Sequence, residues 1–440
     1  MSEHTRRQFV ELSGAVIGGI AAGSTVTAAA HTDRFIVQTG GERLPSNVEV
    51  IHEMPGVDIA VVRGSESDLK QTKTVVGYVS DIELQLDDPD LNSDAPTVED
   101  TSVKNEPLYP LQWDKQALDV SEAHETTKGK GTRVAIIDTG VAAGHPDLEV
   151  NKHLSRNFTG DGFGAGVPAG GYHGTHVAGI AAAQTDNQEG VAGTAPETDL
   201  VDCRVFSPGA LASFGDVLAA VVYSANIDAD AANLSLGAYP IPRQGLGSFY
   251  GKVLNRVMTY ADKEGTLLAI AAGNDSADLQ HDKNFISLPN EGAQAVSVSA
   301  TGPIGYEWGE EGLEAPPASP AFYTNYGTNA ITLGAPGGDA DVSAIGTGVP
   351  WYYDLVLSTI AVPAFNENGN YVGANYGYGW AAGTSMAAPQ VAGAAALVKA
   401  NNPNYNADQV ESALKTAADV PDGYEKTYYG SGFLNIIGAL

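Results

Sequence analysis

Four polar residues that lie far apart in the chain have the types needed to hydrolyse a peptide bond: Asp138, His173, Asn274 and Ser385. This reaction requires a nucleophile, a base that takes and returns a proton, a group that orients the base, and donors for the oxyanion. A serine, an imidazole, a carboxylate and a carboxamide can fill these roles. Each residue taken alone also has a simpler structural interpretation. We therefore judge the catalytic interpretation of each one from the helix or strand expected around it.

Ser385 lies where a helix is expected to begin. Gly383 and Thr384 precede it, and small apolar residues from 391 to 398 follow it, as in a helix that is enclosed on all sides. Unpaired N–H groups and the helix dipole favour developing negative charge at such a position. A serine there can equally be a helix cap. We expect Pro389 to fall within the first turn, because a later proline removes a helix hydrogen bond.

The other three residues end or follow expected strands, or begin an expected helix. Asp138 closes an apolar run, where an unpaired carboxylate would be costly to bury, and His173 is its natural partner. Asn274 follows the strand expected over 266–271, and its amide could join the Ser385 N–H in stabilising an oxyanion. An aspartate at a strand end is as often structural, and an asparagine after glycine is often a turn residue.

His173 and His176 suggest a different chemistry. Three residues apart on a helix, they share a face and could bind a metal, which makes a metallohydrolase the main alternative enzyme class. No further cluster with the spacing of a zinc protease accompanies them. A secreted binding protein without activity is the other alternative.

Strands and helices alternate from Trp113 onward. Strands are expected over 133–137, 199–206, 231–236, 266–271 and 294–299, and helices from 173, over 215–226, over 248–263 and from 385. This alternation predicts an α/β domain with a mostly parallel central sheet. Its active site should lie at the carboxyl edge of the strands.

Four blocks of this sequence resemble the subtilisin-like serine proteases, the subtilases of peptidase family S8. They are the aspartate block 134–140, the histidine block 173–179, the oxyanion block 271–274 and the nucleophile block 383–389. They occur in the family's order within residues 106–440, and the chain looks most like extracellular proteases of the haloarchaeal halolysin type. Many of those carry a further C-terminal domain, which we do not expect here.

The resemblance implies a three-layer subtilisin-like fold and a secreted serine endopeptidase that forms an acyl-enzyme. Ser385 would attack, His173 would move the proton, Asp138 would orient the imidazole and Asn274 would stabilise the oxyanion. His176 would then be a packing residue, and no catalytic metal is expected. Gln390 departs from the family, because many relatives have histidine after the proline of this block.

The resemblance also assigns residues to the substrate. A protein or peptide chain would lie as an added strand along two backbone strips. The strips are Ser235, Leu236 and Gly237, and Ala271, Ala272 and Gly273. Small side chains there leave a roomy apolar pocket, which predicts broad cleavage after large uncharged residues. Asp275 near its mouth would add tolerance for basic residues.

A structural calcium site is implied after the histidine helix. Calcium prefers oxygen ligands from carboxylates, amides and backbone carbonyls. The resemblance assigns Asp147, Asn187 and the carbonyls of Thr185, Glu189 and Val191, with Gln112 as a weaker candidate. A polar turn without a metal is the alternative.

The first part of the chain has the patterns of a signal peptide followed by a propeptide. Residues 1–30 contain Arg6-Arg7, an apolar run and a small-residue end, which predicts a twin-arginine signal peptide cleaved after Ala30. Short β-branched runs over 31–105, with a polar stretch and an acidic linker, predict a small α+β unit resembling the propeptide that assists folding and inhibits the enzyme. Processing is expected within 95–110, although an independent binding domain is the alternative. Residues 106–440 would be the catalytic domain.

Composition sets outer limits on the function. Fifty-three acidic and 23 basic residues give a net charge of −30, which argues against nucleic acid or an anionic membrane as a partner. The same imbalance favours a protein active at high salt over a merely acidic secreted protein.

The single cysteine, Cys203, cannot form an internal disulfide and is expected to be a buried strand residue. We expect a monomer. Three long segments, 302–321, 337–354 and 364–378, are expected to be surface insertions around the cleft.

Overall fold

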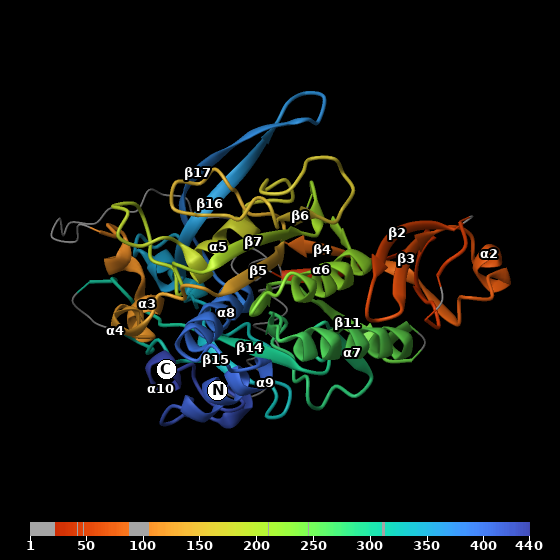
Figure 1. Ribbon diagram of the computed structural model, residues 1–440. Helices are drawn as coiled ribbons and strands as arrows, with labels where there is room; N and C mark the ends of the chain where they lie inside the picture. The colour runs from red at the N-terminus through yellow and green to blue at the C-terminus, as the bar shows by residue number, and fades with distance from the viewer. Residues whose placement is uncertain are drawn as a thin grey trace.

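The computed structural model of the protein describes residues 23–41, 43–46, 48–87, 105–209, 211–244, 246–309 and 313–440. The twin-arginine motif and most of the acidic linker lie outside these ranges. Figure 1 shows a large body of helices around a central sheet, a small β-rich unit beside it and a long projecting hairpin. Within the described residues, no helix combines the length and the apolar character needed to cross a membrane.

The central sheet of the described chain is parallel throughout, with the strand order β15-β14-β12-β10-β5-β7-β6. Its strands are β5 (Arg133–Asp138), β6 (Arg156–Asn157), β7 (Asp199–Arg204), β10 (Ala231–Leu234), β12 (Leu267–Ala271), β14 (Ala295–Thr301) and β15 (Leu333–Pro336). The predicted parallel sheet is therefore confirmed. Strands β6 and β15 were not expected, because each is short and lacks an apolar run of its own.

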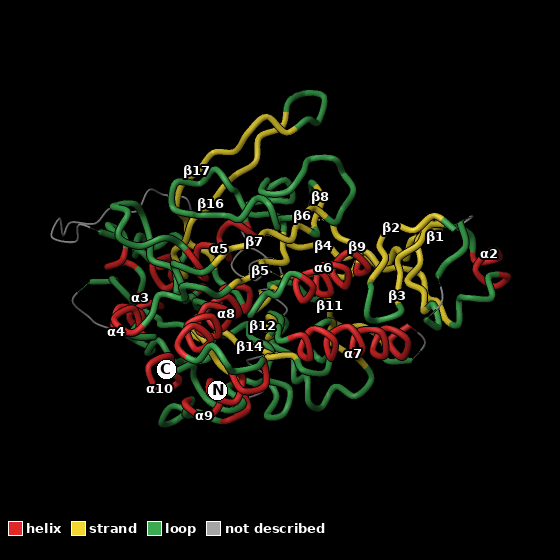
Figure 2. The backbone as a smooth tube through the Cα atoms, viewed as in Figure 1, coloured by secondary structure: helices red, strands yellow, loops and turns green. Residues whose placement is uncertain are grey.

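Helices cover both faces of this sheet, which makes the three predicted layers (Figure 2). Helices α5 (His173–Ala182) and α8 (Thr384–Asn401) pack on one face, and α6 (Phe214–Asn226) and α7 (Leu246–Glu264) pack on the other. The alternation of side chains along a strand explains the two cores. In β5, Val134 and Ile136 join the first core, whereas Ala135 and Ile137 join the second.

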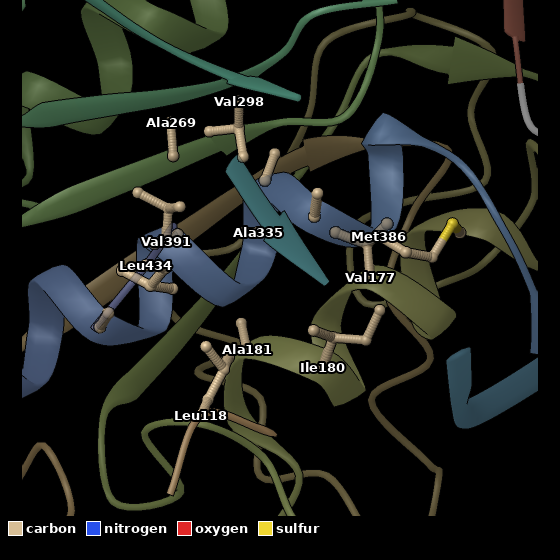
Figure 3. Close-up of a cluster of buried hydrophobic side chains, with 14 of the residues drawn as sticks. Leu118, Val177, Ile180, Ala181, Ala269, Val298, Ala335, Met386, Val391 and Leu434 are labelled. Carbon is tan, nitrogen blue, oxygen red and sulfur yellow. The ribbon is translucent and has the colours of Figure 1, made fainter. Parts of the chain in front are cut away.

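Helix α8 runs through the first core and is buried on every side from residue 384 to residue 398. Figure 3 shows Met386 and Val391 of this helix among side chains of the sheet and of α5. Pro389 lies five residues after the start at Thr384, so the expectation that it falls in the first turn is wrong. Proline has no N–H, so Pro389 cannot donate the usual helix hydrogen bond to the Ser385 carbonyl. That carbonyl instead accepts a hydrogen bond from the Ser235 hydroxyl at 2.7 Å.

The N-terminal unit is the small α+β domain that the sequence predicts. It contains β1 (Gly23–Gln38), β2 (Glu49–Met54), β3 (Ile59–Arg63), α2 (Glu66–Gln71) and β4 (Gly77–Asp87). Its antiparallel sheet continues into β9 (Leu211–Ser213) and β8 (Phe206–Ser207) of the larger body. Strand β1 begins before the predicted signal cleavage after Ala30, and that cleavage point stays a prediction.

The N-terminal unit and the larger body share one apolar core, because Ile36 and Val61 belong to the same cluster as Val217 and Tyr250. Charged groups lie beside this core. We call Arg34, His52, Asp81 and Asp216 the docking cluster. The bonds from Arg34 and His52 to Asp216 cross the boundary between the two units, whereas the bond from Arg34 to Asp81 lies within the N-terminal unit.

The remaining described elements are short or belong to surface segments. They are α3 (Trp113–Ala117), α4 (Val120–Thr126), β11 (Ala238–Pro242), β13 (Phe285–Leu288), β16 (Val356–Phe365), β17 (Tyr371–Ala381), α9 (Ala407–Ala417), α10 (Ile436–Ala439) and the 3-10 turns Tyr109–Leu111, Val342–Ala344, Trp351–Asp354 and Lys426–Tyr428. Cys203 is buried in β7, as expected.

The three long segments differ in their packing. The first two contact each other, because the N–H groups of Gly305 and Tyr306 donate to Asp354 at 3.0 and 2.7 Å. The Tyr306 hydroxyl also donates to the carbonyl of Pro110, so this pair lies against the start of the predicted catalytic domain. The third segment forms most of β17 in the projecting hairpin (Figure 1).

Candidate active site

Asp138 and His173 are brought together at the carboxyl edge of the central sheet. Asp138 is the last residue of β5 and His173 is the first of α5, and both are 0% exposed. Oδ1 of Asp138 lies 2.8 Å from Nδ1 of His173 and accepts the N–H of Thr139 at 2.7 Å. An ionised carboxylate can only accept, so Nδ1 carries the proton and Nε2 is the basic nitrogen.

The close approach of α5 to β5 depends on glycine. A Cβ atom at Gly174 would lie 2.8 Å from the Gly140 carbonyl oxygen and 3.2 Å from the Asp138 Cβ. The absence of a side chain at Gly174 therefore allows this approach. Thr139 adds a bond by accepting the Gly174 N–H with its hydroxyl at 2.8 Å.

Ser385 and Asn274 are brought together by Thr384, the residue directly before Ser385. The Asn274 side-chain oxygen accepts the N–H of Thr384 at 3.0 Å and its hydroxyl at 2.8 Å. The amide oxygen is thereby committed as an acceptor, and the NH₂ group is the end that can donate to an oxyanion. Ser385 itself is 3% exposed, and its hydroxyl donates to the Ser235 carbonyl at 3.3 Å.

The two histidines do not form a metal pair in the described chain. His176 is 0% exposed, and its Nε2 contacts the carbonyl oxygens of Val356 and Gly379 at 3.2 and 3.1 Å. Burial lowers the pKa of His176 to about 3, so the ring is neutral. It joins α5 to the base of the projecting hairpin, as the predicted packing role requires. Among the described residues, no group of three or more His, Cys, Asp or Glu side chains could hold a metal ion.

The two predicted substrate strips differ in how much of their backbone is available. In the second strip, Ala272 pairs through its N–H with Val298 and through its carbonyl with Asn325. Gly273 donates its N–H to Thr384 Oγ1 and accepts the N–H of Asn325. This strip therefore lacks the open edge that strand addition requires, and it can only line a pocket.

The first strip is anchored through Ser235, which holds the Ser385 carbonyl with its hydroxyl and accepts the Asn233 amide at 2.9 Å. Leu236 is buried, and Gly237 lies close to Leu288, because a Cβ atom added to this glycine would be 3.5 Å from the Leu288 carbonyl oxygen. These contacts leave the strip beside Ser385, where the sequence places it.

Asp275 is not the open charge that the sequence suggests near the pocket. Its Oδ2 accepts the Asn325 side chain at 3.0 Å, and burial raises the pKa of its carboxyl group. A carboxyl group held in this way is already hydrogen-bonded within the protein. The expected tolerance for basic substrate residues therefore loses its basis.

The predicted calcium loop is assembled, and its polar groups are joined by hydrogen bonds. Oδ1 of Asp147 accepts the Asn187 amide at 2.7 Å, and Oδ2 accepts the Val191 N–H at 3.0 Å. The Asn187 oxygen accepts the N–H of Glu189 at 3.0 Å, while Gln112 pairs with Ala192 rather than with Asp147. The residue types suit calcium. The NH₂ group of Asn187, rather than its oxygen, faces the Asp147 carboxylate, which is the orientation that hydrogen bonding between the two side chains favours.

Gln390, the departure from the family pattern, lies in a buried polar group that we call the helix cluster, made of Asp114, Lys115, Thr194 and Gln390. All four are 0% exposed. Nζ of Lys115 donates to the Ile180 carbonyl of α5 at 2.8 Å, to Thr194 at 2.9 Å and to the Gln390 oxygen at 2.6 Å. Gln390 in turn donates to Asp114 at 2.7 Å. This cluster joins α3 to both helices that carry the catalytic candidates.

The sequence did not indicate two features of the larger body, strand β9 and the role of Asp202. Strand β9 pairs antiparallel with β4 through Leu84 and Ala212, so it is an edge that accepts another strand. Asp202 of β7 accepts the N–H groups of Val141 and Gly166 at 3.1 and 2.7 Å, which fixes the loop after Asp138. Burial raises the pKa of Asp202 to about 7. A three-residue strand and a single aspartate within a buried strand give no periodic signal, and only their partners in the structure reveal these roles.

Comparisons with known proteins now decide the family. A model of the subtilase family, peptidase S8, matches residues 129–432. The chain belongs to the subtilase family. It is therefore a serine endopeptidase by class, and both the resemblance and the fold class that the sequence indicated are confirmed.

Relatives of this subtilase come from several organisms. Halolysin of Haloferax mediterranei is 30% identical over 421 residues, covering 94% of this chain and 68% of halolysin. Thermitase of Thermoactinomyces vulgaris is 28% identical over 338 residues, covering 76% of this chain and 98% of thermitase.

Among solved structures, a protease from Pseudoalteromonas arctica PAMC 21717 has a TM-score of 0.60 at 27% identity over 77% of this chain and 98% of its own. Fervidolysin of Fervidobacterium pennivorans, with a TM-score of 0.67, 20% identity and coverage of 96% of this chain and 63% of its own, shares the fold. A relative named as an extracellular protease, from Xanthomonas campestris, supports an extracellular location for this subtilase.

Proposed function

We propose that this subtilase cleaves proteins with Ser385 as nucleophile, His173 as base, Asp138 as the group that orients the base, and Asn274 as oxyanion donor. The observation that carries the proposal is the 2.8 Å bond between Asp138 and His173, at the same sheet edge where Asn274 is bonded to the residue before Ser385. Four residues of the required types thus occupy one edge of the sheet.

The reaction follows from these positions. Nε2 of His173 takes the Ser385 hydroxyl proton while Oγ attacks the substrate carbonyl carbon. The oxyanion accepts the Ser385 N–H, at the positive end of α8, and the Asn274 NH₂ group. His173 then gives its proton to the leaving amine, which departs and leaves an acyl-enzyme. Water, deprotonated by His173, releases the acid and restores Ser385.

Ser385→Ala tests this proposal directly. We expect a folded chain with protease activity reduced by at least about 10⁴-fold, together with loss of labelling by a phosphonofluoridate. Proteolysis that survives in Ser385→Ala, or that depends on stoichiometric zinc, would favour the metallohydrolase instead.

The proposed specificity is broad, with a preference for large uncharged residues before the scissile bond. Small side chains in both strips, and the hydrogen-bonded state of Asp275, support a pocket without an open charge. A library of peptide substrates that differ only in this residue tests the preference. Faster cleavage after lysine or arginine than after leucine or phenylalanine would contradict it.

The N-terminal domain is proposed to be an inhibitory propeptide, comprising residues 31–105 and preceded by a signal peptide of residues 1–30. Residues 106–440 would remain as the catalytic domain, and the enzyme would act as a monomer. The pairing of β4 with β9 supports this proposal, because it bonds the N-terminal domain directly to a strand of the larger body. Activity that appears only after the N-terminal domain is lost would support this role, whereas a fully active uncleaved chain would exclude it.

Calcium is proposed as a structural ion held by Asp147, Asn187 and the carbonyls of Thr185, Glu189 and Val191. It would neutralise a carboxylate whose pKa burial raises. The Asp147→Asn variant should lose the rise in melting temperature that millimolar calcium gives to the unchanged chain. An equal rise in both proteins would exclude this site.

Export by the twin-arginine pathway and activity at high salt are further proposals. The charge of −30 supports the second, because screening by molar salt shortens self-repulsion to a few Å. We expect the melting temperature and activity to rise from low to molar NaCl. A flat response would contradict the halophilic proposal.

Replacement of Arg6-Arg7 by two lysines should stop export through the twin-arginine pathway.

A further inference from the structure

One buried side chain, that of Asn325, holds the backbone on both sides of Asn274. It is 0% exposed, and its amide uses both of its donors and both of its acceptor positions. Its partners are the N–H groups of Asp275 and Ala277 at 2.9 Å each, and the Ala272 carbonyl and Asp275 carboxylate at 3.0 Å each. The backbone N–H of Asn325 adds a bond to the Gly273 carbonyl at 2.9 Å.

The turn that Asn325 holds has an unfavourable local conformation. Gly273 has a φ of +101°, and a Cβ atom there would lie 2.4 Å from the Asn325 Nδ2. Ser276 also has a positive φ, of 51°. Backbone in these regions persists only where surrounding contacts fix it. The neighbouring segment supplies them, because Ser276 also donates its N–H to Tyr323 and its hydroxyl to Phe322.

We propose that Asn325 is the positioning residue for the oxyanion donor of this subtilase. Asn274 itself is held at its oxygen by Thr384, so the direction of its NH₂ group depends on where the turn 272–277 places its Cα. An oxyanion donor stabilises the transition state only at about 2.7–3.1 Å from the developing charge. Asn325 fixes that placement without touching substrate. This inference rests on the proposed role of Asn274.

The test compares Asn325→Ala with the unchanged chain, both produced at full length and normalised by titration of active Ser385. We expect kcat to fall about 10- to 100-fold while KM changes less than about threefold, because the donor is displaced and substrate binding is not. The same change introduced into Asn274→Ala should lower kcat less than about threefold further, because the donor that Asn325 positions is already gone. An unchanged kcat, or an equal loss in the Asn274→Ala background, would overturn the proposal.

A neighbouring residue provides the matched control. Thr324 is also buried, and its hydroxyl accepts the Ala300 N–H of β14 at 3.0 Å and donates to the backbone carbonyl of Asn325 at 3.1 Å. It bonds to no group of the turn 272–277 and leaves the four bonds of the Asn325 side-chain amide in place. Thr324→Val should lower the melting temperature and leave kcat within about twofold. A loss of kcat as large as that of Asn325→Ala would show that general destabilisation explains both, and would refute the positioning role.

A polarity exchange keeps the proposal testable if Asn325→Ala does not fold. Asn325→Asp retains the acceptor for Asp275 and Ala277 but places two carboxyl groups together. Adding Asp275→Asn restores a donor to that pair, so kcat of the double variant should recover at least about fivefold over Asn325→Asp. Absence of recovery in a folded double variant would contradict the inference.

The proposed function and this inference can fail separately. If Ser385→Ala keeps its activity, the catalytic assignment is wrong. If Ser385→Ala is inactive and Asn274→Ala is impaired, but Asn325→Ala has normal kcat, only the positioning role is wrong.

Discussion

The helix cluster and the docking cluster are both buried networks of charged side chains, and they differ in how water can reach them. Lys115 and Asp114 lie inside the catalytic body, joined by the neutral amide of Gln390, and unfolding alone can solvate them. Asp216 lies at the contact between two units, where both Arg34 and His52 bond to it. Separation of the units would expose these groups to water without breaking any bond of the helix cluster.

The two clusters contain similar bonds. Whether water can reach such a network therefore depends on whether it lies within one unit or between two. Asp81 of the N-terminal domain accepts the Gly215 N–H at 2.9 Å, in the first turn of α6 in the larger body. Water can replace a carboxylate at an exposed helix end. No such replacement is open to the Ile180 carbonyl, which accepts Lys115 deep in the first core.

The largest expected effect is on the helix cluster, where we propose Lys115→Met in a Ser385→Ala background that prevents self-digestion. Removing the ammonium leaves the Asp114 carboxylate buried without its cation, which should lower the free energy of unfolding by about 3–5 kcal/mol. Denaturant unfolding measures this. Lys415→Met is the control, because its exposed pair with Glu411 contributes about 0.5 kcal/mol or less. A loss below about 1 kcal/mol for Lys115→Met would erase the distinction between the clusters.

A substitution in the docking cluster should change how fast the N-terminal domain is released, rather than the stability of the fold. Asp216→Asn removes the charge that Arg34 and His52 share and should weaken docking of the N-terminal domain by about 2–3 kcal/mol. The lag before the full-length chain begins to cleave a chromogenic peptide should shorten, while the final activity per active site stays the same. A lag as long as that of the unchanged chain would show that the cluster does not hold the domain.

The two clusters should also differ in alkali. Burial lowers the pKa of Lys115 to about 8, below its value of 10.5 in the unfolded chain. Between these values the unfolded chain holds a proton that the folded chain has lost, so stability should rise with pH by about 2–3 kcal/mol. Unfolding at pH 7.5, 9 and 10.5 measures this rise, and Lys115→Met should lack it. An identical slope in both proteins would assign the effect elsewhere.

The smallest effect is expected for Gln390→His. A neutral imidazole can donate to Asp114 and accept from Lys115, as the amide does, so stability near pH 8 should fall by no more than about 1 kcal/mol. Protonation in acid removes the acceptor and places a second cation beside Lys115. The melting temperature of Gln390→His should therefore drop faster than that of the unchanged chain between pH 7 and pH 5. Parallel curves would mean that Gln390 only fills space.

Local sequence predicted most of the elements because the parallel sheet has strong signals. The apolar run ending at Asp138 became β5, and the small-residue run after Ser385 became α8, since burial on both sides demands continuous apolar character. Strand β9 was missed because its three residues, Leu211–Ser213, form a strand only through pairing with β4. Pro389 was misplaced because its missing hydrogen bond is compensated by Ser235, which lies 154 positions earlier in the chain.

The sequence by itself determined the family, the parallel α/β architecture and the identity of the four catalytic candidates, because these depend on residue types in fixed local blocks. Only the tertiary structure decided which polar groups are already paired. It showed that Asp275 is bonded to Asn325, that Gln390 joins Lys115 to Asp114, and that the strip around Ala272 has no open edge. Hydrogen bonds between distant segments depend on how the layers pack, and no local pattern of residues encodes that packing.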